Sequence, residues 1–316
     1  MELSEIQETV QKVVSNINKV IVGRESVIEL VMVALLCEGH VLIEDVPGIG
    51  KTTLAKAAAR SLGCTFRRIQ FTPDLLPSDV TGIYYFNQKA QEFQFRPGPI
   101  MAQIVLADEI NRATPRTQSS LLEAMQERQV TVDVETKALP RPFMVLATQN
   151  PIELEGTFPL PEAQIDRFLL KIQLGYPSEK EENDILLRFE REDPLETLEA
   201  VTSPEELLHM QEATRRLTVE ESVREYIVKI VRATRNHHHV ELGVSPRGSM
   251  ALYRAVQALA AIRGRDFVIP DDVKELAPPV LTHRILISAQ TRLRGRTPEE
   301  IMIEIVEKVA VPVDEL

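Results

Sequence analysis

The stretch LIEDVPGIGKTT (42–53) contains the residue types that bind a chain of phosphates. It overlaps a short apolar run, HVLIED (40–45), that predicts a buried strand, and it leads into KTTLAKAAARSL (51–62), which is rich in helix formers. A glycine-containing turn between a strand and a helix is the setting of a P-loop, where backbone N–H groups and the helix N-terminus surround phosphate oxygens. An ordinary strand–turn–helix connection is the weaker alternative. The residues expected around the nucleotide are Pro47, Gly48, Ile49, Gly50, Lys51, Thr52 and Thr53.

Two side chains of this stretch have defined roles in a P-loop, and one residue departs from the pattern. Lys51 is expected to reach the β- and γ-phosphates, and the hydroxyl of Thr52 to bind Mg²⁺. The full pattern is G-x-x-x-x-G-K-[ST], and Asp45 stands at the position of its first glycine. Aspartate tolerates turn geometry better than most residues, but it adds negative charge near the phosphates. We therefore expect Asp45 to weaken nucleotide binding without removing the site.

A pair of acids ends a second predicted strand, QIVLADE (103–109). In a P-loop sheet, an Asp in the position of Asp108 holds Mg²⁺ through water, and the neighbouring Glu109 can act as general base for water that attacks the γ-phosphate in line. A strand that merely ends in solvated charges is the alternative, and the preceding P-loop makes it the weaker one. The predicted metal ligands are thus Thr52 and Asp108, and the predicted catalytic residues include Lys51 and Glu109.

Further elements must position these residues, and the region 1–176 alternates predicted strands with predicted helices. The five strands are expected at 40–45, 65–71, 103–109, 143–150 and 168–174. Such alternation predicts the α/β class, a parallel five-stranded sheet with helices on both faces. Two segments stand apart, because VTVDVETKALPRPF (130–143) predicts a hairpin and FTPDLLPSDVTG (71–82) a loop.

The region 177–316 predicts a second, smaller and all-helical domain. Helix starts are indicated by Ser178 with Glu181, by Ser203, by Thr218 with Glu221, by Ser245 before a proline, and by Asp271 or Asp272. No convincing strand pair is evident in this half of the sequence. We therefore expect two domains, 1–176 and 177–316.

Composition disfavours three classes: nucleic-acid-coating proteins, membrane proteins and disulfide-rich secreted proteins. The 316 residues carry a formal net charge of −11, which disfavours a broad basic face that coats nucleic acid. There is no run of 18 or more apolar residues, so no membrane insertion is expected. The two cysteines form neither a disulfide framework nor a metal-binding spacing. Without the pattern of a signal peptide, a cytoplasmic location is the expectation.

Several blocks of sequence together resemble the MoxR family of AAA+ ATPases. They are EDVPGIGKTT (44–53), IVLADEINRATPRTQSSLLEAMQERQV (104–130), VLATQNPIELEGTFPLPEAQIDRF (145–168) and VSPRGSMALYRAVQALA (244–260). The segment 71–82 also matches, so the resemblance covers nearly the whole chain. It implies a P-loop αβα sandwich followed by a helical lid domain, with ATP and Mg²⁺ as cofactors. Asp45 is the departure, since the wider AAA+ pattern has glycine there.

The resemblance assigns roles that the residues alone leave open. Asn150 is similar to sensor 1, although a turn-forming Asn before proline is the alternative. Arg167 resembles the arginine finger that enters a neighbouring subunit's site, where the alternative is a surface ion pair with Asp166 or Glu162. Arg247 resembles sensor 2. It lies in the first turn of a predicted helix, where the helix dipole disfavours a cation, so a phosphate or a nearby acid is expected beside it. The candidates for the adenine border are Val22 and Gly23.

The function that this resemblance implies is Mg²⁺-dependent ATP hydrolysis by a chaperone-like motor. The expected clients are proteins such as those with a von Willebrand factor A domain, and the arginine finger implies a homo-oligomeric, hexameric ring. Two other functions stay open. A nucleic-acid-dependent motor would use residues 71–99 as an insert, against the acidic balance of the chain. An ATP-binding switch would turn over very slowly, against the intact Asp108–Glu109 pair.

Overall fold

The computed structural model describes residues 2–133, 135–152, 156–190 and 193–312. Its centre is a parallel sheet of five strands in the order β2-β5-β8-β1-β9. The strands are β1 (Val41–Glu44), β2 (Phe66–Gln70), β5 (Ile104–Asp108), β8 (Met144–Gln149) and β9 (Leu170–Ile172). The predicted α/β class, with its five-stranded parallel sheet, is confirmed.

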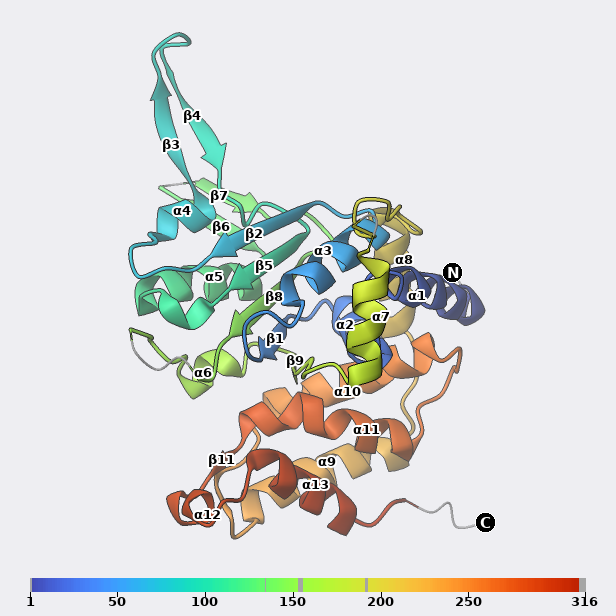
Figure 1. The fold of residues 1–316 in the computed structure, drawn as a ribbon. Coiled ribbons are helices and arrows are strands. Elements are labelled where there is room, and N and C mark those ends of the chain that lie inside the picture. Colours follow the sequence, from blue (N-terminus) through green and yellow to red (C-terminus); the bar gives the residue numbers. More distant parts are fainter. Residues whose placement is uncertain (1, 134, 153–155, 191–192, 313–316) are drawn as a thin grey trace.

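Helices cover both faces of this sheet (Figure 1). The helices α1 (Leu3–Ile17), α2 (Glu25–Leu36) and α3 (Lys51–Ser61) share one apolar core with alternate strand residues such as Val41 and Ile43. Leu42, between those two, belongs to a separate core with α5 (Pro115–Glu127) on the opposite face. A strand whose successive side chains enter two cores reads as a continuous apolar run, and this is why the local sequence identified the strands.

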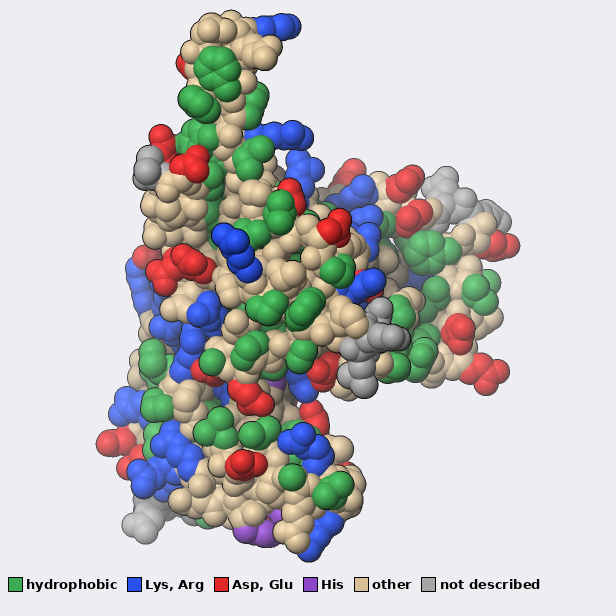
Figure 2. All heavy atoms as spheres, turned by 90° about the vertical axis from the view of Figure 1, so that its left-hand side faces the viewer, with side chains coloured by type: hydrophobic (Ala, Val, Ile, Leu, Met, Phe, Trp, Pro, Cys, Tyr) green, Lys and Arg blue, Asp and Glu red, His purple; other side chains and the backbone are tan. Residues whose placement is uncertain are grey.

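A long hairpin projects from one end of the sheet (Figure 1). It consists of β3 (Gly82–Asn87) and β4 (Glu92–Pro97), which pair antiparallel over their whole length. Figure 2 shows apolar side chains along this projection, and its exposed large apolar residues are Ile83, Tyr85, Phe86 and Phe93. The short helix α4 (Pro77–Thr81) precedes it, so the expectation of a loop at 71–82 was wrong there. Pro77 occupies the first position of α4, where the missing N–H has no cost.

Four short elements complete this part of the chain. The strands β6 (Gln129–Val132) and β7 (Glu135–Ala138) pair antiparallel, which confirms the hairpin predicted in 130–143. The 3₁₀ turn η1 (Ile110–Arg112) directly follows β5, and α6 (Glu162–Ile165) precedes β9.

The rest of the chain is mainly helical. Its elements are α7 (Glu179–Arg188), α8 (Pro204–Arg215), α9 (Glu221–Asn236), β10 (Val240–Leu242), α10 (Pro246–Ile262), α11 (Pro270–Leu281), η2 (Thr282–Arg284), β11 (Leu286–Ile287), α12 (Ala289–Leu293) and α13 (Pro298–Lys308). The antiparallel pair β10–β11 corrects the expectation that this half has no strands. Its members are two and three residues long, too short to produce a readable alternation.

Helix caps in this region were predicted with mixed success. Ser178 and Ser203 each accept a hydrogen bond from the backbone three residues later, as expected. Thr218 does not cap α9, whose N-cap is Glu220, so that prediction was wrong. The backbone of Thr218 instead forms a β-bridge with Phe267, which holds it extended before the helix begins.

The helical part packs closely against the α/β part. The helix α10 contacts α1 and α2, and α8 also contacts α2, so lid residues share a core with the helices of the sheet. In Figure 1, α9 and α11–α13 lie on the side of α10 that faces away from the sheet. A boundary at 176/177 stays a prediction. None of the described helices has the length and apolar character that crossing a bilayer requires.

Candidate nucleotide site

The P-loop forms a turn between β1 and α3, and two glycines determine its shape. Gly48 has φ of 86° and Gly50 has φ of 91°, a region that only glycine enters readily. A Cβ added at either glycine would meet no atom within 4 Å, so backbone conformation is the constraint here, and not space. The turn leaves Lys51 and Thr52, the first two residues of α3, on the wall of a pocket.

This phosphate pocket has a volume of about 380 Å³. Its lining residues are Pro47, Gly48, Gly50, Lys51, Thr52, Thr53, Arg68, Asp108, Glu109 and Asn150. All but Arg68 were predicted from the sequence as nucleotide, metal or catalytic residues. The fold thus brings the P-loop, the acidic pair at the end of β5 and the residue after β8 to one edge of the sheet.

Asp45 lies just before the P-loop, and its carboxylate is engaged by the backbone. Its Oδ2 accepts hydrogen bonds from the N–H groups of Leu174 at 2.7 Å and Gly175 at 2.8 Å, and its Oδ1 accepts one from Val46 at 3.0 Å. The carboxylate therefore joins the P-loop to the segment after β9, and it is outside the described lining of the phosphate pocket. This geometry gives no support to the expected weakening of nucleotide binding.

Lys51 is held by neutral acceptors. Its Nζ donates to the carbonyl oxygens of Asp45 at 2.7 Å and Val46 at 2.9 Å. Partial burial lowers the pKa of Lys51, and the negative charges of Asp45, Asp108 and Glu109 partly offset that effect. Two carbonyl oxygens bind an ammonium group less strongly than phosphate does, so Lys51 is free to exchange them for a phosphate chain.

Asp108 is held from both sides by the strands that flank β5. Its Oδ1 accepts a hydrogen bond from the Thr148 hydroxyl on β8 at 2.6 Å. Its Oδ2 accepts two from Arg68 on β2, at 3.0 Å from Nε and 2.6 Å from Nη2. A carboxylate and the hydroxyl of Thr52 on one pocket wall are hard oxygen ligands, the kind that Mg²⁺ prefers.

Glu109 follows β5 with a left-handed backbone, at φ 56°. Its N–H donates to the Thr148 hydroxyl at 2.8 Å. Its Oε2 accepts hydrogen bonds from Gln70 at 2.8 Å and from Arg112 at 3.1 Å. Non-glycine residues adopt this backbone rarely, and they do so mainly where a site needs it. The turn places the Glu109 carboxylate on the wall of the phosphate pocket, where it is only partly buried.

Asn150 lines the same pocket, and it also forms a turn. Its Oδ1 accepts a hydrogen bond from the N–H of Ile152 at 3.1 Å. This is the local contact expected of an Asn that precedes proline. Both interpretations of Asn150 that the sequence allowed are therefore compatible with its place.

A smaller apolar pocket of about 220 Å³ adjoins the P-loop. Its lining residues are Val20, Ile21, Val22, Arg24, Gly48, Ile49, Gly50, Thr53, Leu174, Pro177, Ile185 and Phe189. Apolar walls beside a phosphate-binding turn suit a purine base. Val22 is in this pocket, as expected for the adenine border. Gly23 is not in its described lining, and its φ of 65° is a backbone conformation that favours glycine.

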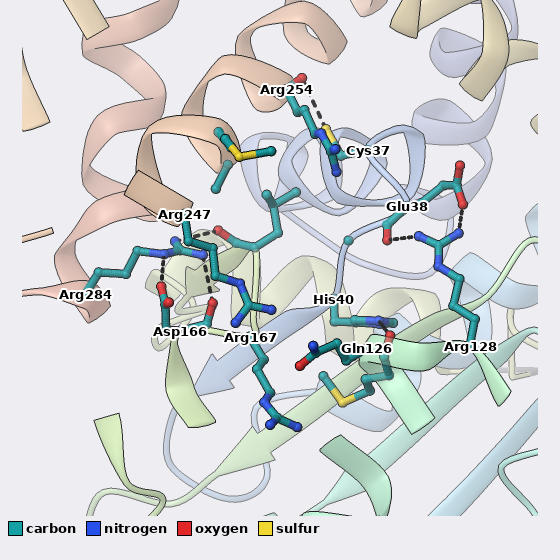
Figure 3. Close-up of a pocket in the computed structure, with 15 residues that line it drawn as sticks. Cys37, Glu38, His40, Gln126, Arg128, Asp166, Arg167, Arg247, Arg254 and Arg284 are labelled. Carbon is teal, nitrogen blue, oxygen red and sulfur yellow. Dashed lines mark hydrogen bonds and ion pairs between the residues drawn. The ribbon is translucent and has the colours of Figure 1, made fainter. Parts of the chain in front are cut away.

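Arg167 and Arg247 line a third pocket, of about 270 Å³, together with Arg254 and Arg284 (Figure 3). Neither is in the described lining of the phosphate pocket, although the sequence suggested a phosphate beside Arg247. Arg247 does lie in the first turn of α10, as predicted. The docking of the lid places that turn next to the loop that carries Arg167.

Asp166 is not the partner of Arg167, because Arg284 occupies it. The Nε of Arg284 donates to Oδ1 of Asp166 at 2.7 Å (Figure 3). Its Nη2 donates to the carbonyl of Phe168 at 2.6 Å. Burial lowers the pKa of Arg284, and the charge of Asp166 offsets part of that effect. Within the described part of the chain, neither Arg167 nor Arg247 forms an ion pair.

Comparison with known proteins agrees with this geometry. Residues 40–170 match the model of the ATPase family associated with various cellular activities, and residues 232–305 match the AAA lid domain. The chain is 43% identical over 313 residues to Chaperone MoxR1 of Mycobacterium tuberculosis, across 96% of this chain and 82% of that protein. It is 34% identical over 298 residues to Protein MoxR of Paracoccus denitrificans, across 86% and 87% of the two chains. This chain belongs to the MoxR family of AAA+ ATPases.

Two further relatives extend the match. The MoxR-family chain is 55% identical over 302 residues to the uncharacterized protein YeaC of Bacillus subtilis, across 96% of this chain and 94% of the relative. A crystal structure of a protein from Cytophaga hutchinsonii superposes with a TM-score of 0.92 at 36% identity, covering 98% and 97% of the two chains. The AAA+ fold with its lid is therefore shown, and the activity of this MoxR-family chain is that of a nucleotide-binding ATPase.

The sequence did not reveal the residues that hold the acidic pair in place. Arg68 and Gln70 of β2 and Thr148 of β8 contact Asp108 or Glu109. The parallel register of β2 and β5 sets Gln70 opposite Asp108. Polar residues near the ends of strands that flank β5 were the available signal. It becomes usable only once the strand order is known.

Proposed function

We propose that this MoxR-family chain hydrolyses ATP with Mg²⁺ and uses the energy to remodel partner proteins. The observation that carries the proposal is the phosphate pocket, because four side chains line this single cavity: Lys51, Thr52, Asp108 and Glu109. A P-loop lysine, a hydroxyl and carboxylate for a metal, and a second carboxylate for water are the parts that phosphoryl transfer to water requires. The base would occupy the adjoining apolar pocket beside Val22.

Each residue of the pocket has one task in this proposal. Lys51 leaves two carbonyl oxygens and binds the β- and γ-phosphates. Thr52 and Asp108 would hold Mg²⁺, which would supply positive charge to the phosphate chain. Glu109 accepts a proton from the attacking water, and Gln70 keeps its carboxylate oriented. Asn150 positions that water or a γ-phosphate oxygen.

Arg167 and Arg247 complete the site of a neighbouring subunit in this proposal. Both lie in a pocket separate from the phosphate pocket of their own chain, and Arg284 has already taken Asp166. Two guanidinium groups at one cavity attract an anion, and the triphosphate of an adjacent subunit supplies one. A closed ring follows, because each site then needs a neighbour. We propose a homohexamer.

The clients and location are proposed from the relatives. A related protein is named Chaperone MoxR1, which supports protein remodelling as the purpose of hydrolysis. We propose protein clients, including those with a von Willebrand factor A domain, and a cytoplasmic location. The net charge of −11 supports a protein client over a nucleic acid. Stimulation of the ATPase by single-stranded DNA would favour the nucleic-acid motor, and tight ATP binding without turnover would favour the switch.

The decisive experiment is complementation between two inactive variants. Arg167→Ala keeps its own Glu109, and Glu109→Gln keeps its own Arg167. If Arg167 acts on the neighbouring site, neither variant alone turns over ATP, whereas a mixture regains part of the activity. Arg216→Ala is the control, because Arg216 forms an exposed ion pair with Glu212 and should leave turnover unchanged. Failure of the mixture to recover, although mixed oligomers form, would refute the shared site.

A further inference from the structure

Both carboxylate oxygens of Asp108 accept hydrogen bonds, and Arg68 supplies two of the three from side chains. Thr148 is fully buried and its hydroxyl donates to Oδ1 of Asp108 at 2.6 Å. Arg68 donates to Oδ2 with Nε at 3.0 Å and Nη2 at 2.6 Å, and these two hydrogen bonds fill both accepting positions of that oxygen. Neither Mg²⁺ nor a water molecule bound to it can therefore contact Oδ2 while both hydrogen bonds from Arg68 are in place. The proposed metal ligand is thus already occupied by a cation of the protein itself.

The surroundings of Arg68 make this contact exchangeable. Its side chain is 46% exposed, whereas that of Asp108 is only 11% exposed. The ion pair is therefore anchored on the aspartate side and open to solvent on the arginine side. The Nη2 of Arg68 also donates to Gln70, a neutral acceptor on the same strand. Arg68 itself lines the phosphate pocket, so its guanidinium group has open space to move into.

We propose that Arg68 is a positioning residue that competes with Mg²⁺ for Asp108, so that the metal must displace its guanidinium group before it can bind at this carboxylate. This inference rests on the proposed function, because it needs a nucleotide and a metal in this pocket. Before binding, the guanidinium group stabilises Asp108, which would otherwise be a nearly buried carboxylate beside Glu109. On binding, Mg²⁺ would displace the guanidinium group, whose side chain is 46% exposed and can turn toward solvent.

Competition of this kind has a measurable consequence. The apparent affinity of a ligand falls in proportion to the fraction of protein in which its site is free. Removal of Arg68 should therefore lower the Mg²⁺ concentration needed to tighten nucleotide binding. The ion pair is half-exposed, so we expect a shift of about fivefold. Without Mg²⁺, the same variant should bind nucleotide more weakly, because the charge of Asp108 then lacks its counter-ion.

The test is a Mg²⁺ titration of nucleotide binding, with a fluorescent, non-hydrolysable ATP analogue as the probe. Arg68→Gln should reach half-maximal tightening at about one fifth of the wild-type Mg²⁺ concentration. Arg68→Lys keeps the charge but lacks the planar fork, so it should fall between the two. Arg67→Gln is the matched control, because Arg67 is an exposed residue of the same strand. Thermal unfolding of each variant shows that it is folded.

The outcomes separate this inference from the proposed function. If the wild-type protein fails to bind the analogue at any Mg²⁺ concentration, the proposed function fails and this inference with it. If the wild type binds and tightens with Mg²⁺, but Arg68→Gln has an unchanged or higher half-point, only the competition is overturned. A lower unfolding temperature with an unchanged half-point would mark Arg68 as a mere link between β2 and β5, and would equally overturn it.

Discussion

Replacement of Arg284 should damage both the stability of the protein and the placement of Arg167. The Arg284 side chain is 3% exposed and that of Asp166 is 22% exposed. Besides Asp166, the guanidinium group donates to the carbonyl of Phe168 at 2.6 Å, of Leu169 at 3.2 Å, and of Val280 in its own lid. One side chain therefore connects the lid to the loop before β9.

The magnitude follows from what the substitution leaves behind. Removal of one partner of a buried ion pair costs about 3–5 kcal/mol, because the other charge stays buried without compensation. Asp166 keeps some access to water, so the lower end applies, and we expect Arg284→Ala to lose about 3 kcal/mol of unfolding free energy. Arg284→Lys retains the charge but cannot span the same carbonyl groups, so its loss should be smaller.

Urea unfolding measures this loss, and Arg216→Ala provides the comparison. The side chains of Arg216 and Glu212 are 77% and 66% exposed, and such surface pairs contribute less than about 1 kcal/mol. Arg284 also donates to the carbonyl of Asp166 at 3.3 Å, so it bonds the backbone on both sides of Arg167. The variant should therefore lose ATPase activity at temperatures where it is still folded. A stability loss under about 1 kcal/mol would refute the reasoning.

Three further predictions concern single side chains. Glu109→Gln should retain ATP binding and lose turnover by at least about 100-fold, the contribution of a general base, as measured by binding and steady-state rates. Asp45→Ala should lose about 2 kcal/mol in urea unfolding, because three backbone N–H groups lose their acceptor, while ATP affinity changes less than about threefold. His40 accepts from the N–H of Val145 at 3.0 Å, and burial lowers the pKa of His40 to about 4. The unfolded chain then binds the proton first, so stability should fall by about 1.4 kcal/mol per unit as pH drops from 6.5 toward 4, and His40→Gln should flatten that slope.

The strands and the P-loop could be predicted because their signals are local. Each central strand enters two cores, so its apolar run is legible without knowledge of its neighbours. The GIGKTT turn is equally local, since its glycines satisfy a backbone requirement of the turn itself. The pair β10–β11 carries no such signal, because two or three residues show no period. The prediction that Thr218 caps a helix failed for a related reason. A residue distant in sequence, Phe267, holds the backbone of Thr218 extended.

The position of a residue on its own helix was predictable, but the neighbour that it meets was not. The sequence correctly placed Arg247 in the first turn of α10, and it left open whether a phosphate or an acid would lie there. The answer depends on how the lid docks, and Arg284 fixes that docking through Asp166. The docking directs Arg247 toward Arg167 and away from the phosphate pocket of its own chain.

For the acidic pair Asp108-Glu109, too, the local sequence predicted the residues but not their contacts. A strand ending in Asp108-Glu109 predicted a metal ligand and a base from local sequence alone. Whether those carboxylates are free depends on β2, which the strand order sets beside β5. Arg68 and Gln70 reach the two acids because alternate residues of a strand share a face. The motif thus determines what chemistry the pocket can perform, and the neighbouring strand determines what must be displaced before that chemistry begins.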